Sequence, residues 1–293
     1  MKRWTRWTLT LIGAVMGGGA IASALGMSAW NRQSARMIGE LNEEVVDADP
    51  AVFSRDELQG LPAPVVRYFE FALSPGQPLI RTARIAHRGE FRAGIDARWS
   101  PFRSVQHFVV QRPGFVWDAR VRMAPLVTVR VRDSYIGGHA GMHARLAGLV
   151  DVVDEAGAPH LNAGALHRLL LESTWFPTAL LPSQGVRWQA IDDRSALASL
   201  SDSGVTVSMV VHFADGGEIV RVEADRMRDV NGVGILTPFI GHLHEYARID
   251  GIMIPIRGEV EWILPEGTLR FWRGRVTDAT YGYASGVTDD STR

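Results

Sequence analysis

Two histidines two positions apart are residues with a spacing that suits metal chemistry. They lie in the segment GHLHEY, where His242 and His244 fall on the same side of a predicted strand. Such a pair chelates Zn²⁺ only with a third ligand from elsewhere, for which His212 and Glu259 are the candidates. Because H-x-H alone is a weak signal, the sequence predicts neither a metal site nor a cofactor.

Nucleophilic and acid–base chemistry has no recognisable motif here. The sequence contains no G-x-S-x-G, S-x-x-K, Walker A or G-x-G-x-x-G pattern, the spacings that position a nucleophile or a phosphate. It also contains no Cys, which excludes thiol nucleophiles, thiolate metal sites, disulfides and an acylated lipoprotein cysteine. No enzyme is therefore predicted, and a hydrolase using Glu172 or the His242/His244 pair is kept as a third hypothesis.

Large apolar side chains in alternating positions indicate binding instead. In RPGFVWDARVRM, residues 112–123, apolar side chains alternate with Asp118, Arg120 and Arg122. This period of two describes a strand with one apolar and one solvated face. Aromatics on such faces either fill a core completely or line a cavity for an acyl chain. With Phe271 on the same faces, the candidate cavity-lining residues are Phe91, Phe108, Phe115, Trp117, Met123, Trp175, Phe176, Trp262 and Trp272.

Segments with this period follow one another through most of the chain. Turn signals such as Arg112-Pro113-Gly114 and Asp215-Gly216-Gly217 separate them, and helical patterns are confined to 54–73 and 161–174, the latter capped by Asn162. We therefore expect a mainly β protein, an antiparallel half-barrel of about a dozen strands with two or three covering helices. The expected strands are 82–93, 103–111, 115–123, 126–135, 138–150, 186–191, 194–201, 204–213, 218–227, 237–248, 252–263 and 268–281.

Two further segments leave alternatives open. ESTWFPTALLP, residues 172–182, is apolar although loops usually lie on the surface. It is either a plug packed into the sheet or a lid or membrane-touching tip. The alternating Arg120, Arg122, Arg130 and Arg132 are either a solvated outer face or a face that meets anionic headgroups.

The N-terminal residues carry the information on location. Basic residues at positions 2, 3 and 6 precede an uncharged stretch from Thr8 to Trp30, which is long enough to cross a bilayer. The basic flank predicts an anchor in the bacterial inner membrane with an extracytoplasmic C-terminal domain. Alternatively, Ala22-Ser23-Ala24 is a signal-peptide cleavage site, and the rest is periplasmic or secreted.

The chain resembles a group of known carriers. GEFR (89–92), VQHFVVQRPGFVW (105–117) and VRVRDSYIGG (129–138) resemble, in this order, the LolA/LolB/LppX group of periplasmic lipid and lipoprotein carriers, and HEYARIDGIMIPIRGEVEW (244–262) is similar to their closing strands. The chain also resembles an uncharacterised bacterial family of membrane-anchored proteins that have WFPTALLP (175–182) and LPEG…WRG (264–274).

The resemblance implies a half-barrel that encloses a hydrophobic cavity for acyl chains. Two departures limit it: WFPTALLP lies outside the carrier pattern, and an uncleaved anchor would forbid shuttling. The turn in R-P-G-F-V-W is also one residue shorter than the carrier motif. The identity of the ligand is therefore not implied.

The sequence predicts four regions: an anchor or signal peptide (1–30), a polar stalk or a helix leaving the membrane (31–53), one β half-barrel (54–282) and a disordered tail (283–293). The predicted function is non-catalytic, extracytoplasmic binding of a lipid or other amphiphile. The alternative is a solid-cored envelope module that binds a protein partner and exposes an apolar patch. With a net charge of −1, no nucleic-acid partner is expected.

Overall fold

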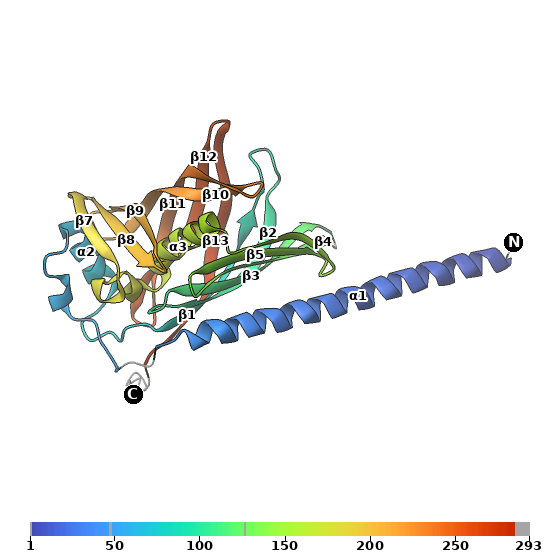
Figure 1. The fold of residues 1–293 in the computed structure, drawn as a ribbon, viewed down its shortest axis with the longest axis horizontal. Helices are drawn as coiled ribbons and strands as arrows, with labels where there is room; N and C mark the ends of the chain where they lie inside the picture. Colours follow the sequence, from blue (N-terminus) through green and yellow to red (C-terminus); the bar gives the residue numbers. More distant parts are fainter. Residues whose placement is uncertain (1, 47–48, 126, 285–293) are drawn as a thin grey trace.

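The computed structural model describes residues 2–46, 49–125 and 127–284, with side chains from residue 22 onward. All 13 strands belong to one antiparallel sheet with the order β6-β5-β4-β3-β2-β1-β13-β12-β11-β10-β9-β8-β7. Figure 1 shows the two limbs of this sheet curving around helix α3. The mainly β half-barrel expected from the period-two segments is confirmed.

The bounds of the strands follow the alternating segments closely. They are β1 (Thr82–Phe91), β2 (Ser100–Val109), β3 (Gly114–Ala124), β4 (Val127–Ile136), β5 (His139–Leu146), β6 (Val150–Ala156), β7 (Arg187–Asp192), β8 (Ser195–Asp202), β9 (Val205–Phe213), β10 (Ile219–Val230), β11 (Val233–Ile249), β12 (Ile252–Leu264) and β13 (Gly267–Gly282). The helices are α1 (Lys2–Glu43), α2 (Ala63–Ala72) and α3 (Pro159–Glu172), with short 3₁₀ segments η1 (Arg55–Leu58), η2 (Ser173–Trp175), η3 (Pro177–Leu180) and η4 (Pro182–Gln184).

One strand differs from the sequence-based expectation. The segment 138–150, expected as a single strand, turns back at Ala147 and Gly148, whose φ angles are 50° and 75°. Strand β6 follows the turn and forms an edge of the sheet. Its Val150 and Val152 are more than half exposed, so the strand lacks the buried face that makes an alternating pattern recognisable.

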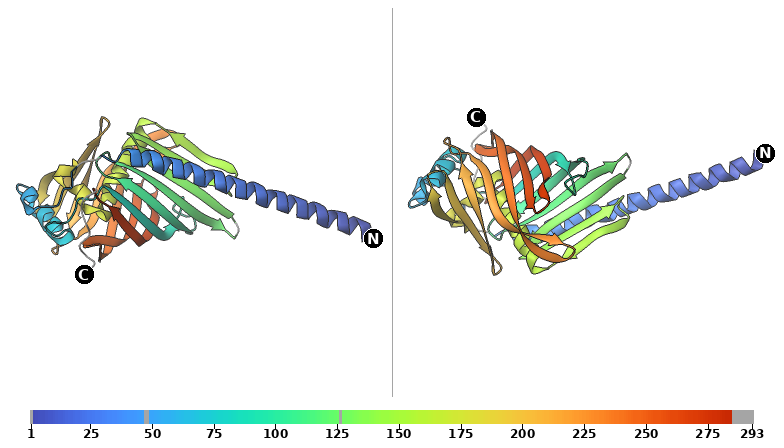
Figure 2. Two further views of the ribbon diagram at one scale, coloured as in Figure 1. Left: turned by 90° about the horizontal axis from the view of Figure 1, so that it is seen from below. Right: turned by 90° about the horizontal axis from the view of Figure 1, so that it is seen from above.

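The strand order explains why the chain crosses the inside of the half-barrel. Strands β6 and β7 are consecutive in the sequence, but they form the two opposite edges of the sheet. The connection from 157 to 186 must therefore span the concave side, and it does so as α3 and η2–η4. Figure 2 shows this connection between the two limbs.

The segment WFPTALLP is a plug, one of its two predicted forms. Every residue from 175 to 181 is buried, and the rings of Phe108 and Phe176 lie 4.5 Å apart. The backbone of the plug is tied to the sheet, because Tyr281 donates a hydrogen bond to the carbonyl of Trp175 and Trp188 donates one to that of Leu180. The plug fills the end of the half-barrel that is covered by α2.

Helix α3 begins earlier than its sequence signal suggests. It starts at Pro159, which follows Ala158 at the N-cap. Asn162 is not the cap; its side-chain oxygen accepts a hydrogen bond from the backbone N–H of Ala140. This contact ties the helix to β5, while Leu166 and Leu170 are fully buried beneath it.

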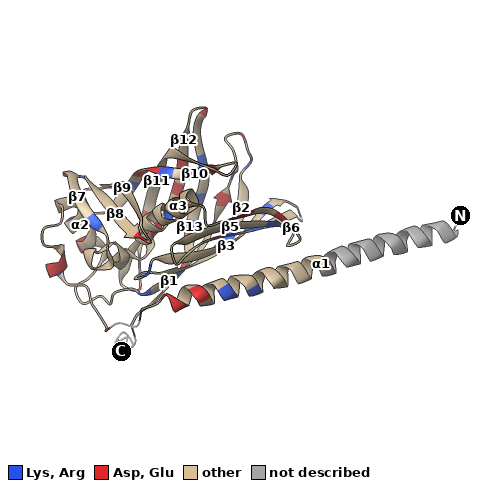
Figure 3. Ribbon diagram, viewed as in Figure 1, with Lys and Arg blue, Asp and Glu red and all other residues tan. Residues whose placement is uncertain are grey.

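The first part of the segment 31–53 is helical, the second of its two predicted forms, and the helix is docked on the sheet. Helix α1 continues to Glu43 and lies along the outer face of β2–β4 (Figure 2). Among its residues from 22 onward, whose side chains are described, the charged ones gather toward its C-terminal end (Figure 3). Trp30 and Leu41 are fully buried there. The Trp30 indole and the Ser34 hydroxyl both donate to Asp118, at 2.8 and 2.5 Å.

The arginines that alternate on β3 and β4 separate into two groups. Arg132 is buried with its guanidinium 4.4 Å above the Trp30 ring, and Arg130 pairs with Asp118 at 2.6 Å. Arg120 and Arg122 are exposed. The outer face is therefore partly solvated and partly a docking surface for α1, which the alternation alone does not distinguish.

The predicted anchor and tail fall largely outside the described part of the chain. Within the described residues, no helix is long and apolar enough to cross a membrane. The side chains of 1–21, which include most of the predicted anchor, and residues 285–293 of the predicted tail lie outside the description.

Truncating the plug tests its contribution to stability. We expect Phe176→Ala to lower the free energy of unfolding by about 3–5 kcal/mol, because it removes a buried ring from a packed site. Urea titration of the purified chain measures this change. The control Ile191→Ala, at a side chain 52% exposed on β7, is expected to change stability by no more than about 0.5 kcal/mol. Equal effects of the two substitutions would contradict the role of the plug.

Candidate functional site: an apolar cavity with a charged floor

A cavity of about 490 Å³ lies between the two limbs of the half-barrel, beyond the plug. One limb contributes residues of β3–β6 and the other residues of β10–β13, while α3 and η2 form the floor. The lining is mostly aliphatic and aromatic. The connection across the concave face therefore fills one end of the half-barrel and leaves space at the other.

Six of the nine predicted residues line this cavity: Phe91, Trp117, Met123, Trp175, Trp262 and Trp272. Phe239 and Phe271 extend the wall, with ring centroids 5.1 and 5.9 Å from that of Trp262. Met123 is 52% exposed, which places it at the rim, whereas Trp117 is 8% exposed. The aromatic faces of β3, β12 and β13 thus meet around one space.

The other three predicted residues, Phe108, Phe115 and Phe176, do not line the cavity. They are each 1% exposed and pack together where the plug meets β2 and β3. They lie on the same kind of apolar strand face as Trp117. Their position along the strands separates them, because the plug occupies that end.

An ion-pair cluster forms the floor of the cavity. Arg168 on α3 donates to Asp133 at 2.5 Å and to Glu172 at 2.8 Å. Gln106 donates to the second oxygen of Glu172 at 2.6 Å. Burial raises the pKa of Asp133 and of Glu172, and the nearby Arg168 opposes this effect without cancelling it. Arg168 is therefore a cation paired with two carboxyl groups.

A second arginine on the floor is bound differently. The Nε of Arg226, on β10, donates to the carbonyl of Gly164 at 3.0 Å, and its guanidinium lies 5.1 Å from the Phe239 ring and 5.4 Å from the Trp262 ring. Burial, followed by the nearby Arg168, lowers the pKa of Arg226 to about 10. Among the described residues its two Nη groups have no hydrogen-bond or ion-pair partner, although the side chain faces the cavity.

Of these charged groups, sequence reasoning identified only Glu172 as a candidate. Asp133 follows the alternating Arg130 and Arg132 on β4, but it belongs to the other face of the strand and lines the cavity. The sequence contains the signal for this position, because Asp133 lies two and four residues after Val131 and Val129, which also line the cavity, and alternate residues of a strand point to the same face. In the same way, Arg226 lies four residues after the buried Val222 on β10 and therefore on the same face of that strand.

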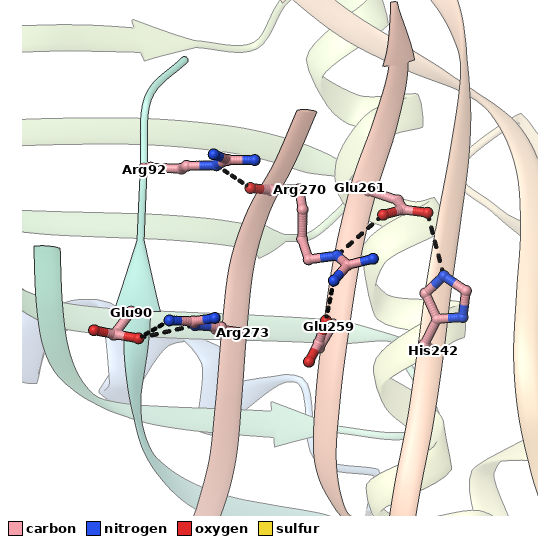
Figure 4. Close-up of polar contacts among 7 residues, drawn as sticks. All are labelled: Glu90, Arg92, His242, Glu259, Glu261, Arg270 and Arg273. Carbon is pink, nitrogen blue, oxygen red and sulfur yellow. Dashed lines mark hydrogen bonds and ion pairs between the residues drawn. The ribbon is translucent and has the colours of Figure 1, made fainter. Parts of the chain in front are cut away.

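Of the predicted metal ligands, His242 on β11 and Glu259 opposite it on β12 are among the residues that line the cavity, whereas His244 and His212 are not. His242 contacts Glu261 at 3.2 Å, and Glu261 pairs with Arg270, which also binds Glu259 (Figure 4). His212 instead pairs with Glu223 at 2.8 Å. Within the described residues, no group of three His, Asp or Glu side chains is placed to hold a metal ion.

Figure 4 also shows polar contacts between β13 and β1. Arg273 on β13 binds Glu90 at 2.6 Å, and Arg92 donates to the backbone carbonyl of Arg270. These contacts join the first and last strands of the domain on their solvated face. They stabilise the central pairing of β1 with β13, and they do not converge on the cavity.

A buried histidine supports the aromatic wall from behind. His87 on β1 is 2% exposed, with its ring 4.3 Å from Trp175 and 5.9 Å from Trp272. Neither ring nitrogen has a hydrogen-bond partner among the described residues. Burial, aided by repulsion from Arg168, lowers the pKa of His87 to about 3. The ring is therefore neutral and packs as an aromatic residue.

This low pKa makes the stability of the fold depend on pH. Between pH 6.5 and about 3, His87 takes up a proton in the unfolded chain but not in the folded one, so stability falls as the pH falls. We expect His87→Leu to reduce the slope of unfolding free energy against pH by up to about 1.4 kcal/mol per pH unit in this window. Urea titrations from pH 4 to 6.5 measure both slopes, and identical slopes would show that His87 is protonated in the folded state.

Removing the central cation of the floor tests the ion-pair cluster. We expect Arg168→Met to lower the free energy of unfolding by about 3–5 kcal/mol, because it leaves Asp133 and Glu172 buried without their partner. Adding Asp133→Asn and Glu172→Gln to this variant is expected to restore part of the loss. The exposed pair of Arg257 with Glu245 supplies the control: Arg257→Met is expected to change stability little. A similar loss in both single variants, measured by urea unfolding, would contradict the cluster's role.

Several solved structures are similar to this chain. The chain is similar to a LolA superfamily protein from Nitrosomonas europaea, with 11% identity, 75% of this chain and 94% of that chain covered, and a TM-score of 0.36. It is also similar to a putative outer membrane lipoprotein-sorting protein domain from Vibrio parahaemolyticus, with 9% identity, 71% of this chain and 87% of that chain covered, and a TM-score of 0.36. A DUF1329 family protein from Desulfovibrio piger is similar as well, with 13% identity, 77% of this chain and 92% of that chain covered, and a TM-score of 0.32.

One of these similar solved structures is a LolA superfamily protein, the group that the sequence motifs resemble. No curated protein matches the sequence. The family comparison covers nearly the whole half-barrel, from residue 59 to residue 281. On that match, the chain belongs to DUF6920, a family of unknown function.

Proposed function

We propose that this protein binds one amphiphilic molecule in the cavity of its half-barrel, without covalent chemistry. The observation that carries the proposal is an apolar space of about 490 Å³ at the end of the half-barrel that the plug leaves open. Cavities of roughly 300–1,000 Å³ with mostly apolar walls and a few polar groups are typical of small-ligand sites. A single acyl chain is a ligand of this size.

The walls of the cavity suit a hydrocarbon chain. Val121, Val131 and Trp262 line it beside the other aromatic residues, and each methylene group moved from water into such surroundings stabilises the complex by about 0.8 kcal/mol. The rim is apolar as well, since Met123, Met142 and Val152 are 52%, 39% and 53% exposed. A chain that enters therefore meets apolar surface from the rim to the floor.

The floor favours binding over catalysis. Both oxygens of Glu172 accept hydrogen bonds, from Arg168 and from Gln106, so this carboxyl group has no free oxygen directed at a ligand. The alternative of a solid-cored envelope module requires a filled interior, which the plug supplies at one end of the half-barrel. The space above the floor favours the amphiphile.

The proposal includes a location. The uncharged run that begins at Thr8 after three basic residues supports an anchor in the bacterial inner membrane, with the half-barrel on the extracytoplasmic side; its last residue, Trp30, is packed against Asp118 of the half-barrel, so the part that crosses the membrane ends before it. An amphiphile in that membrane would be close to the cavity.

A substitution that fills the cavity tests the proposal directly. Val131→Trp places a large ring in the cavity, whereas Val220→Trp adds the same ring at an exposed position of β10. We expect the full-length wild type and the Val220→Trp variant to bind the neutral fluorophore N-phenyl-1-naphthylamine and to yield an amphiphile on solvent extraction. Val131→Trp is expected to lose at least about tenfold in fluorophore affinity, which corresponds to the burial of two methylene groups.

The comparison of the two variants controls for lipid that adheres elsewhere. Any membrane lipid carried along by the N-terminal segment is common to all three proteins, so the difference between them reports the cavity. Equal fluorophore binding and equal extracts from all three would contradict the proposal.

A further inference from the structure

The two arginines on the floor of the cavity differ in their ion pairs and in the N–H donors that have no partner. Arg168 is paired with both Asp133 and Glu172. Arg226 is held only through its Nε, by the carbonyl of Gly164. Its two Nη groups, four N–H donors, have no partner among the described residues, and the side chain lines the cavity.

Unused donors on a charged group are costly in such surroundings. The Arg226 guanidinium is packed against the rings of Phe239 and Trp262, which supply cation–π attraction but no hydrogen-bond acceptor. Charged groups removed from bulk water are stabilised by pairing and hydrogen bonding. The geometry therefore provides a fixed, aromatic-flanked cation whose open side faces the ligand space.

The surroundings of Arg226 favour an anion over a cation as its partner. Both oxygens of Glu172 and one oxygen of Asp133 already accept hydrogen bonds, and the second oxygen of Asp133 is inaccessible. Among these floor groups no accessible acceptor remains for a cationic head, and Glu259, the other carboxylate in the lining, is paired with Arg270. Burial and then repulsion from Arg168 lower the pKa of Arg226, and attraction by Glu172 and Asp133 opposes this without cancelling it, so a further anion beside Arg226 would stabilise its charge.

We propose that Arg226 binds the carboxylate or phosphate head of a single-chain amphiphile, which enters the cavity head first. This inference rests on the proposed function and adds the charge and the orientation of the ligand. The head lies on the floor against the Nη groups of Arg226, where two parallel N–H···O bonds suit a planar carboxylate or a phosphate. The tail runs along the aromatic walls toward the rim at Met123.

A set of amphiphiles with the same tail and different heads tests the charge. Dodecanoate, dodecyl phosphate, dodecanol and dodecylamine displace N-phenyl-1-naphthylamine from the full-length chain at neutral pH. We expect dodecanoate and dodecyl phosphate to displace it at concentrations about tenfold or more below that of dodecanol, the range of a charge-assisted hydrogen bond. Dodecylamine is expected to be no better than dodecanol.

Substitutions of Arg226 identify the residue that makes the distinction. Arg226→Met keeps an apolar stem and is expected to lose the preference for the anionic heads while it still binds dodecanol. Arg226→Lys keeps the charge and is expected to keep most of the preference. Arg257→Met, on the outer face beside Glu245, removes one arginine elsewhere and is expected to leave the preference unchanged.

The results separate the two proposals. If dodecanoate, dodecyl phosphate and dodecanol compete equally in the wild type, if dodecylamine is preferred, or if Arg226→Met keeps the anion preference, the role of Arg226 is overturned while amphiphile binding stands. If neither Arg226→Met nor Arg226→Lys binds dodecanol, Arg226 supports the walls of the cavity, and its role in head recognition is equally overturned. If no amphiphile displaces the fluorophore from the wild type, the proposed function itself fails.

Discussion

The strand order is the constraint on which the rest of the structure depends. Strands β6 and β7 form the two edges of the sheet and are joined directly in the sequence, so the connection between them must cross the concave face. Helix α3 and the 3₁₀ segments that follow it are therefore inside the half-barrel for topological reasons. Being there, they must be apolar toward the sheet, which is why residues 175–181 are buried although they form only short 3₁₀ segments.

The same crossing divides the interior into a filled end and an open end. At the filled end Phe176 packs on Phe108 and Leu180 is fully buried, as in an ordinary core. At the open end α3 presents Arg168 and Glu172 instead of a further layer of apolar side chains. The concave surface there is wider than one helix can cover, and the cavity is the part left uncovered.

The sequence predicts the sheet well because antiparallel strands with one solvated face have an unambiguous period. It predicts the cavity less completely. The alternation along a strand assigns each residue to one face of the sheet, but it does not tell at which end of the half-barrel the residue lies. Phe115 and Trp117 illustrate this limit: they share a face, and the plug separates them. The docking of α1 is also hidden, because Trp30 ends an apolar run and its contacts with Asp118 and Arg132 join residues distant in the sequence.

The charged floor has a cost that packing alone does not explain. An ion-pair cluster in a low-dielectric site is often no more stable than apolar side chains of the same volume, so Asp133, Arg168 and Glu172 do not serve stability better than leucines would. They do hold a polar surface at the bottom of an apolar space. Arg226, whose Nη groups have no partner among the described residues, adds an unpaired cation to this surface, and the rim remains apolar. A ligand that is charged at one end and apolar at the other therefore has one favourable orientation, in which its tail remains near the rim where Met123 and Met142 are exposed.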